Sequence, residues 1–291
     1  MAARPHIPNP AQWAVGQVVH AGAAARSVAH SVAGPQAADV VVRRITVGDL
    51  KDDLVRGLDD TGAYRTDVFF LCLIYPILGL MLIGLSAQHA LLPLVFPIAA
   101  GFALVGPAAA VGLYEMSRRR ERGLPTTWWD AFGVLGSRAF GAIAVLGLIL
   151  IAVFVAWLVA AYFIYEATVG PEQPASLGAL VRDALTTEAG WTMIAAGMGV
   201  GFLFAVLVLA ISVVSFPLLL DREVGLVKAV STSVRAVMTN PVPMAVWGLI
   251  VAGLLVLGSL PLLLGLIIVM PVLGHGTWHL YRKVVERPTT R

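Results

Sequence analysis

The chain contains a single cysteine among 291 residues, and only 13% of its residues are charged. One cysteine can form neither an intrachain disulfide nor a thiolate metal cluster, so we expect Cys72 to be a packed core residue. Soluble domains carry roughly 25% charged residues, and the deficit argues against an ordinary soluble fold. The chain also lacks a Gly-x-Ser-x-Gly elbow, a zinc-protease motif and a phosphate-binding loop. We therefore predict that it is not an enzyme.

Long uncharged segments account for the low charge. Five of them contain no Asp, Glu, Lys or Arg: 68–85, 90–114, 139–165, 191–220 and 236–281. A helix needs about 20 apolar residues to cross the hydrocarbon core of a membrane, so each of the first four can cross once. The fifth can cross twice, because Gly258-Ser259-Leu260-Pro261 supplies a turn near its middle. The predicted helices are 68–86, 90–115, 139–166, 190–220, 243–260 and 262–281.

The basic residues indicate how these helices are oriented. Nineteen of the twenty Lys and Arg residues flank the uncharged segments on one side, and Arg182 alone falls on the other. Basic residues stay on the cytoplasmic side of a membrane protein, so we predict a multi-pass protein of the bacterial inner membrane with both termini cytoplasmic. The net charge of +3 then reflects topology. The expected partner is the lipid bilayer, and no nucleic acid is expected.

The N-terminal region differs from the rest of the chain. It has no acidic residue before Asp39 and no continuous apolar core of the kind that a secretory signal needs. We predict a flexible tail over 1–42, with a weak helix over 11–33, and a short C-terminal tail over 287–291. An organelle presequence is the alternative interpretation of the N-terminal tail.

Residues 43–286 form the predicted membrane domain, and it contains an internal repeat. Each of three units combines a short cytoplasmic amphipathic helix with a membrane hairpin. The units cover about 46–118, 127–222 and 223–282. Thr46 and Thr127 each precede an Asp by three residues, the spacing of a capping box that begins a helix. The fold class is therefore all-α, with six transmembrane helices arranged as three hairpins.

The short helices carry apolar stripes at helical spacing. The stripes are Val47, Leu50, Leu54 and Leu58 in the first unit; Trp128, Phe132 and Leu135 in the second; and Val224, Val227, Val234 and Val237 in the third. Such helices lie in the headgroup layer or cover the cytoplasmic mouth of a bundle. The first is acidic on its other face and would be repelled by anionic lipid, so we expect it to dock against protein.

Two hairpins end in the same pattern, Pro-x4-Gly-x-aromatic-polar-x2-Arg. One copy runs from Pro107 to Arg118 and the other from Pro271 to Arg282, and helix 190–220 keeps the proline as Pro217. A proline this deep frees a carbonyl group and kinks a helix. Either the three prolines make structural kinks, or they break helices that line a cavity.

The pattern also places ionisable residues in or near the membrane. His275 and His279 share a helix face, the spacing that lets two imidazoles hold one metal ion. Glu115 of the related helix 90–115 could approach them, and Arg118 and Arg282 complete the candidate polar cluster. Structural packing, a proton or substrate relay, and metal or haem binding are the alternatives. Glu166, with Tyr162 and Tyr165, is expected at the opposite interface.

Three segments make the chain similar to a known family. They are 106–123, containing Gly-Leu-Tyr-Glu and Arg-Arg-Arg-Glu-Arg-Gly; 213–221, containing Ser-Phe-Pro-Leu-Leu-Leu-Asp; and 274–282, containing Gly-His-Gly-Thr-Trp-His. They resemble the bacterial integral-membrane domain-of-unknown-function family 2189, and the resemblance covers roughly 43–286. It implies a membrane protein but no established activity, although some members carry the label of a cytochrome c oxidase subunit.

A haem–copper catalytic subunit needs several imidazoles at mid-membrane. Only His275 and His279 lie in predicted helices; His6, His20 and His30 lie in the tail, and His89 lies in an outer loop. The catalytic interpretation therefore fails on the number of ligands, and no cofactor is predicted. We expect a non-enzymatic scaffold, accessory or assembly factor whose partners are subunits of a larger membrane complex. A small-solute or ion transporter, and a haem- or metal-binding membrane protein, are the alternatives.

Overall fold

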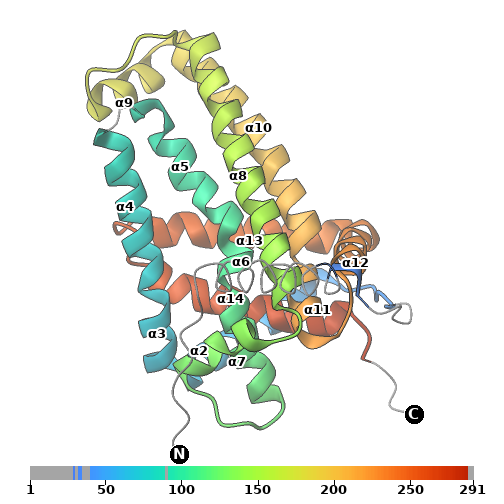
Figure 1. Ribbon diagram of the computed structural model, residues 1–291. Helices are drawn as coiled ribbons and strands as arrows, with labels where there is room; N and C mark the ends of the chain where they lie inside the picture. The colour runs from blue at the N-terminus through green and yellow to red at the C-terminus, as the bar shows by residue number, and fades with distance from the viewer. Residues whose placement is uncertain (1–28, 30–31, 35–39, 89–90, 288–291) are drawn as a thin grey trace, which may run out of the picture.

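The computed structural model describes residues 29, 32–34, 40–88 and 91–287. These residues form helices joined by short connections, with no β-strand among them beyond an isolated antiparallel bridge between Val42 and Val285. The helices α4 (Ile74–Gln88), α5 (Val95–Gly101), α8 (Phe140–Thr168) and α10 (Glu188–Ser212) run side by side along the molecule (Figure 1). The short helix α9 (Leu177–Thr186) lies at one end, and α2 (Val47–Ala63), α7 (Val111–Glu121) and α11 (Ser215–Asp221) lie toward the other (Figure 1). The predicted all-α class is confirmed.

Within the described residues, five helical segments are long and apolar enough to cross a membrane, and they match the first five predicted helices. Asp67–Ser86 combines α3 (Arg65–Cys72) and α4 (Ile74–Gln88), and Leu92–Glu121 combines η1, α5, η2, α6 and α7. The other three are α8 (Phe140–Thr168), α10 (Glu188–Ser212) continued by α11 (Ser215–Asp221), and α13 (Pro241–Ser259). Cys72 is fully buried, as expected.

The sixth predicted helix, 262–281, corresponds to α14, Leu266–Val284, which is not among these five segments. The second half of α14 carries two histidines, Arg282 and Lys283, and these lower its apolar character. Most residues of α14 are nevertheless buried by protein. In Figure 1, α13 and α14 run crosswise to α8 and α10. The count of six crossings and the three-hairpin arrangement therefore remain predictions.

Prolines coincide with two interruptions of the long helices. Around Pro107 the chain passes through α5 (Val95–Gly101), η2 (Phe102–Val105), α6 (Gly106–Ala109) and α7 (Val111–Glu121). Pro217 lies in the first turn of α11, just after α10 ends. Pro271, by contrast, lies inside the continuous helix α14. A proline in the first turn needs no backbone donor, which accounts for the break before α11.

The first amphipathic helix is α2, Val47–Ala63, and Thr46 and Asp49 form the capping box that begins it. It packs on α14, so docking against protein is confirmed. The buried face coincides only in part with the predicted apolar stripe, because Leu50 is buried and Leu54 packs on the core. Leu50, Asp53, Gly57 and Asp60 are buried, whereas Val47 and Leu58 are exposed. The helix is rotated because α14 offers cationic and imidazole partners to its carboxylates.

The other two amphipathic segments also expose part of their predicted apolar stripes. The second is a 3₁₀ helix, η3 (Trp128–Gly136), which also begins with a capping box at Thr127, and its Trp129, Phe132 and Leu135 are exposed. The third is α12 (Leu226–Thr239), in which Val227 is exposed and Ala229, Thr232 and Ser233 are buried. The short helix α9 (Leu177–Thr186) connects α8 and α10 at the other end of the bundle.

Residues 40–43 and 284–286 are held together at the end of the bundle that carries α2. Arg43 donates its backbone N–H to Val284, and Glu286 donates its own to Val41. Val40 is buried, so the last residues of the predicted tail are packed against the helical domain. The rest of the predicted tail over 1–42, including most of the weak helix over 11–33, lies outside the described residues, as does most of 287–291.

Candidate functional site

The polar groups of the interior gather around the second half of α14, which lies between α2 and α7. The backbones of α2 and α14 approach closely at Gly57. A Cβ atom at this position would lie 2.7 Å from the carbonyl oxygen of Val272 and 2.8 Å from the nitrogen of Gly276. Such close packing excludes water and aligns the side chains of α2 with the histidines and the lysine of α14.

Asp60 is the centre of the first cluster and is 4% exposed. The hydroxyl group of Ser117 donates to Asp60 Oδ2 at 2.5 Å, and His279 Nε2 lies 3.0 Å from the same oxygen. Arg120 pairs with the other carboxylate oxygen. His275, which is fully buried, places Nδ1 2.7 Å from the hydroxyl oxygen of Ser117.

The donors and acceptors of this cluster can be assigned. A serine hydroxyl has one proton. Ser117 uses it to donate a hydrogen bond to Asp60, so the Ser117 oxygen accepts a hydrogen bond from His275 Nδ1–H. His279 donates from Nε2, because an ionised carboxylate only accepts. Burial on its own would raise the pKa of Asp60, but hydrogen bonds from His279 and Ser117 outweigh burial and lower it to about 2. Asp60 is therefore an anion bound by three neighbours.

Asp53 lies two turns earlier on the same face of α2 and is in a different state. Its side chain is fully buried, and neither carboxylate oxygen has a hydrogen-bond partner within the described part of the chain. Lys283 Nζ is 3.3 Å from Asp53 Oδ1, and it divides its charge among Asp49, Asp52 and Asp53. Burial raises the pKa of Asp53 to about 6, despite the opposing effect of Lys283.

A second cluster links α7, α11 and α14 near the chain end. Asp221 accepts from the hydroxyl group of Tyr281 at 2.8 Å and from Arg282 Nη1 at 2.9 Å. Glu121 accepts from Arg282 Nη2 at 2.8 Å and also pairs with Arg287. These ion pairs crosslink three helices at the end where the basic residues gather.

The predicted cluster of Glu115, Arg118, His275, His279 and Arg282 is thus divided into separate groups. Glu115 makes a bidentate pair with Arg118, at 2.7 and 3.0 Å, and Arg118 also donates to the carbonyl of Leu220. The expected approach of Glu115 to the histidines was wrong. Residues two apart on a helix are turned by roughly 200°, so Ser117, and not Glu115, faces α14.

Asp60, Ser117 and Asp53 were not predicted as site residues from the sequence. The feature of the sequence that could have identified the two aspartates is the spacing of Leu50, Asp53, Gly57 and Asp60. These residues recur every three or four positions, as the residues of an apolar stripe do. A glycine within a stripe of acids marks a close approach to another backbone. That spacing does not identify the partner helix, which only the folded arrangement supplies.

The metal and transport hypotheses can be compared with this geometry. Among the described residues, no group of three His, Cys, Asp or Glu side chains is arranged to hold a metal ion. The helices α7 and α14 pack tightly, since a Cβ atom on Gly274 would lie 3.0 Å from the Cβ of Leu113. Two hollows of the described structure lie at the opposite end, against α8.

Residues 95–221 match the model of domain-of-unknown-function family 2189, which is described as a predicted integral membrane protein. The match confirms the family that the sequence resembles, over a shorter stretch than the expected 43–286. It includes Pro107, Glu115, Arg118 and Pro217 and leaves out α2 and α14. No curated protein and no solved structure is significantly similar to the chain.

Proposed function

We propose that this chain, whose residues 95–221 belong to a family of predicted integral membrane proteins, is a non-enzymatic scaffold or accessory factor of the bacterial inner membrane. One observation carries the proposal: four of the acidic groups around α14 are paired with cations inside the protein. Asp60, Glu115, Glu121 and Asp221 each pair with a cation of the same chain. Acidic groups that are held by cations of the same chain favour a rigid scaffold over a catalytic cycle.

The lateral surface is the surface available to a partner. Large apolar side chains are exposed along the membrane-spanning helices, among them Leu148, Phe163, Met198, Phe202, Leu203 and Leu249. Gly197 in α10 has open space beside it, so another backbone can come close there. Small residues at such positions favour helix–helix contact in membranes. A partner helix on this face of α10 therefore fits the proposal.

Mild-detergent purification at native expression level, followed by mass spectrometry of co-purifying chains, tests the scaffold proposal. We expect defined membrane-protein partners that are retained by the wild-type chain and reduced by Gly197→Leu. The variant Gly253→Leu is the matched control, because Gly253 of α13 also faces open space. Recovery of the wild-type protein alone, or equal loss of partners in both variants, would contradict the proposal.

A proton pathway is the second candidate function, and the alignment of His275, Ser117, Asp60 and His279 favours it. These groups form a continuous chain of contacts of 3.0 Å or less from a fully buried imidazole to a partly exposed one. Proteoliposomes that contain a pH-sensitive dye test it. Proton flux that Asp60→Asn abolishes would support this candidate, and flux no greater than in empty vesicles would reject it.

A further inference from the structure

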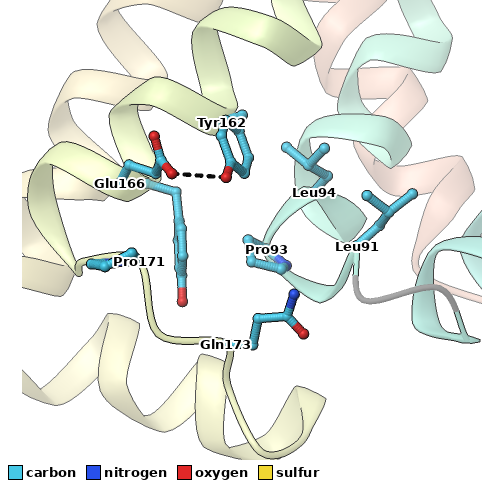
Figure 2. A pocket seen from close by; sticks show the side chains of 8 residues that line it. Leu91, Pro93, Leu94, Tyr162, Glu166, Pro171 and Gln173 are labelled. Atoms are coloured by element: carbon cyan, nitrogen blue, oxygen red, sulfur yellow. Dashed lines mark hydrogen bonds between the residues drawn. The ribbon is translucent and has the colours of Figure 1, made fainter.

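A small pocket with a few polar groups in its wall lies at the end of the bundle opposite the charged clusters. It has a volume of about 40 Å³ and lies between η1 (Leu92–Leu94), the last turns of α8 and the loop that follows α8. Leu91, Pro93 and Leu94 form one side of this pocket, and Tyr162 and Glu166 form the other (Figure 2). Gln173 reaches up from the loop toward Pro93 (Figure 2). The loop is tied down by Tyr165, which donates its hydroxyl to the carbonyl of Glu172 at 2.7 Å.

The pocket continues into an apolar groove. Leu94 and Tyr162 line both hollows, and the groove has a volume of about 270 Å³. Its remaining lining comes from α8: Val155, Leu158, Val159 and Phe163. The groove follows α8 for roughly 12 Å, because a helix rises about 1.5 Å per residue. A pocket that contains a carboxylate and two tyrosines and continues into an apolar groove matches a ligand with a small polar headgroup and a hydrocarbon tail.

The charged residues around the pocket indicate the charge that the headgroup of the ligand should carry. Glu166 lies in the last turn of α8, where the helix dipole is already negative. Its Oε1 accepts from the hydroxyl of Tyr162 at 2.8 Å, and no cation of the described chain pairs with it. Arg182, the basic residue of this end, pairs with Asp183 instead. The site therefore favours a cation that comes from outside the chain.

We propose that this pocket and groove bind a phospholipid whose headgroup carries a primary ammonium. The ammonium lies against Glu166 and the two tyrosines, and one acyl chain lies along α8 in the groove. A pocket of about 40 Å³ has room for about three water-sized groups, since about 10–15 Å³ of such cavity volume holds one water. That size suits an ammonium better than the larger trimethylammonium group.

Competition between lipids on the purified full-length protein tests the proposal. Phosphatidylethanolamine and phosphatidylcholine with identical acyl chains are added in detergent, and bound lipid is counted by native mass spectrometry. We expect the wild-type protein to prefer phosphatidylethanolamine by roughly two- to fivefold, the range of a partly exposed ion pair. Glu166→Gln should remove the preference, and the matched control Glu172→Gln, whose side chain does not line the pocket, should keep it.

Two further experiments distinguish the contribution of the headgroup to binding from that of the acyl chain. Val159→Trp fills the groove and should weaken the binding of both lipids while the protein keeps its helical content. Free ethanolamine at the same concentration should not displace phosphatidylethanolamine, because it lacks the chain that the groove holds. Equal binding of the two lipids by the wild-type protein, an unchanged preference in Glu166→Gln, or displacement by ethanolamine would each overturn the proposal.

Discussion

Asp53 and Asp60 lie on one face of the same helix, yet their surroundings drive their pKa values in opposite directions. Asp60 receives hydrogen bonds from His279 and Ser117, which lower its pKa to about 2. Asp53 receives none within the described residues, and burial raises its pKa to about 6. The difference arises because α14 and α7 converge on Asp60, whereas Asp53 pairs with Lys283, which is shared with Asp49 and Asp52.

Replacing Asp60 with Asn should destabilise the folded protein by about 2 kcal/mol, because Asn lacks the negative charge and one of the two acceptor oxygens that the neighbouring donors use. The folded pKa of Asp60 is depressed, so its contribution is present above pH 4 and is lost as the pH falls toward 2. Thermal unfolding in detergent at pH 7 measures the effect. Asp59→Asn is the control, since Asp59 is exposed. Equal midpoints for Asp60→Asn and the wild type would contradict this role.

The variant Asp53→Asn should change the free energy of unfolding in the opposite direction and stabilise the protein. The folded pKa of Asp53 is raised, so the wild-type protein loses stability as the pH rises from about 4 to about 6. Asn removes that cost and should stabilise the protein by roughly 2 kcal/mol at pH 8, with little effect at pH 4. Lys283 keeps Asp49 and Asp52 as partners. Unfolding midpoints across this pH range provide the measurement, and a pH-independent difference would count against a buried charge.

At the scale of elements, the contact between α2 and α14 sets the geometry of the site. Gly57 faces the backbone of α14 at Val272 and Gly276, whereas Gly62, one turn later, has open space beside it. The two glycines thus serve different purposes within one helix. At position 57 the absence of a side chain permits the approach of α14, and at position 62 nothing in the structure requires it.

The substitutions Gly57→Ala and Gly62→Ala should therefore have opposite effects on the stability of the protein. A Cβ at position 57 forces α2 away from α14 and should cost about 1–3 kcal/mol, as overpacking does. At position 62, in open space, Ala should stabilise the helix by about 0.5–1 kcal/mol. Chemical unfolding of both variants in the same detergent compares them. Stabilisation by both substitutions would show that α2 and α14 are not in backbone contact.

The sequence predicted elements better than it predicted contacts between them. Uncharged segments located helices to within a few residues, as for 139–166 against Phe140–Thr168, because crossing lipid requires a fixed apolar length. The capping boxes at Thr46 and Thr127 are local and were also predictable. The pairing of Asp60 with Ser117 and His279 was not, since it depends on the rotation of three helices about their axes. The repeat indicated that Glu115 could approach the histidines, but in the folded chain Asp60 lies beside His279.

At the scale of the whole molecule, the two chain ends meet at the charged end of the bundle. Arg43 pairs with Glu286 at 2.9 Å, and Arg282 and Arg287 both pair with Glu121. Residues near 43, 121 and 287 therefore lie on one side of any membrane that the helices cross. This adjacency does not depend on whether α14 crosses the membrane, and it agrees with the concentration of basic residues at this end.

Accessibility to a membrane-impermeant maleimide tests this sidedness. Ala175→Cys should be labelled in intact spheroplasts, because the loop after α8 lies at the end away from the basic residues. Leu124→Cys and Arg287→Cys should react only after permeabilisation, since cationic side chains resist transfer across the membrane. The wild-type chain is the control, because Cys72 is fully buried and should not react. Labelling of Leu124→Cys and Arg287→Cys from opposite sides would contradict both the predicted topology and the ion pairs of Glu121.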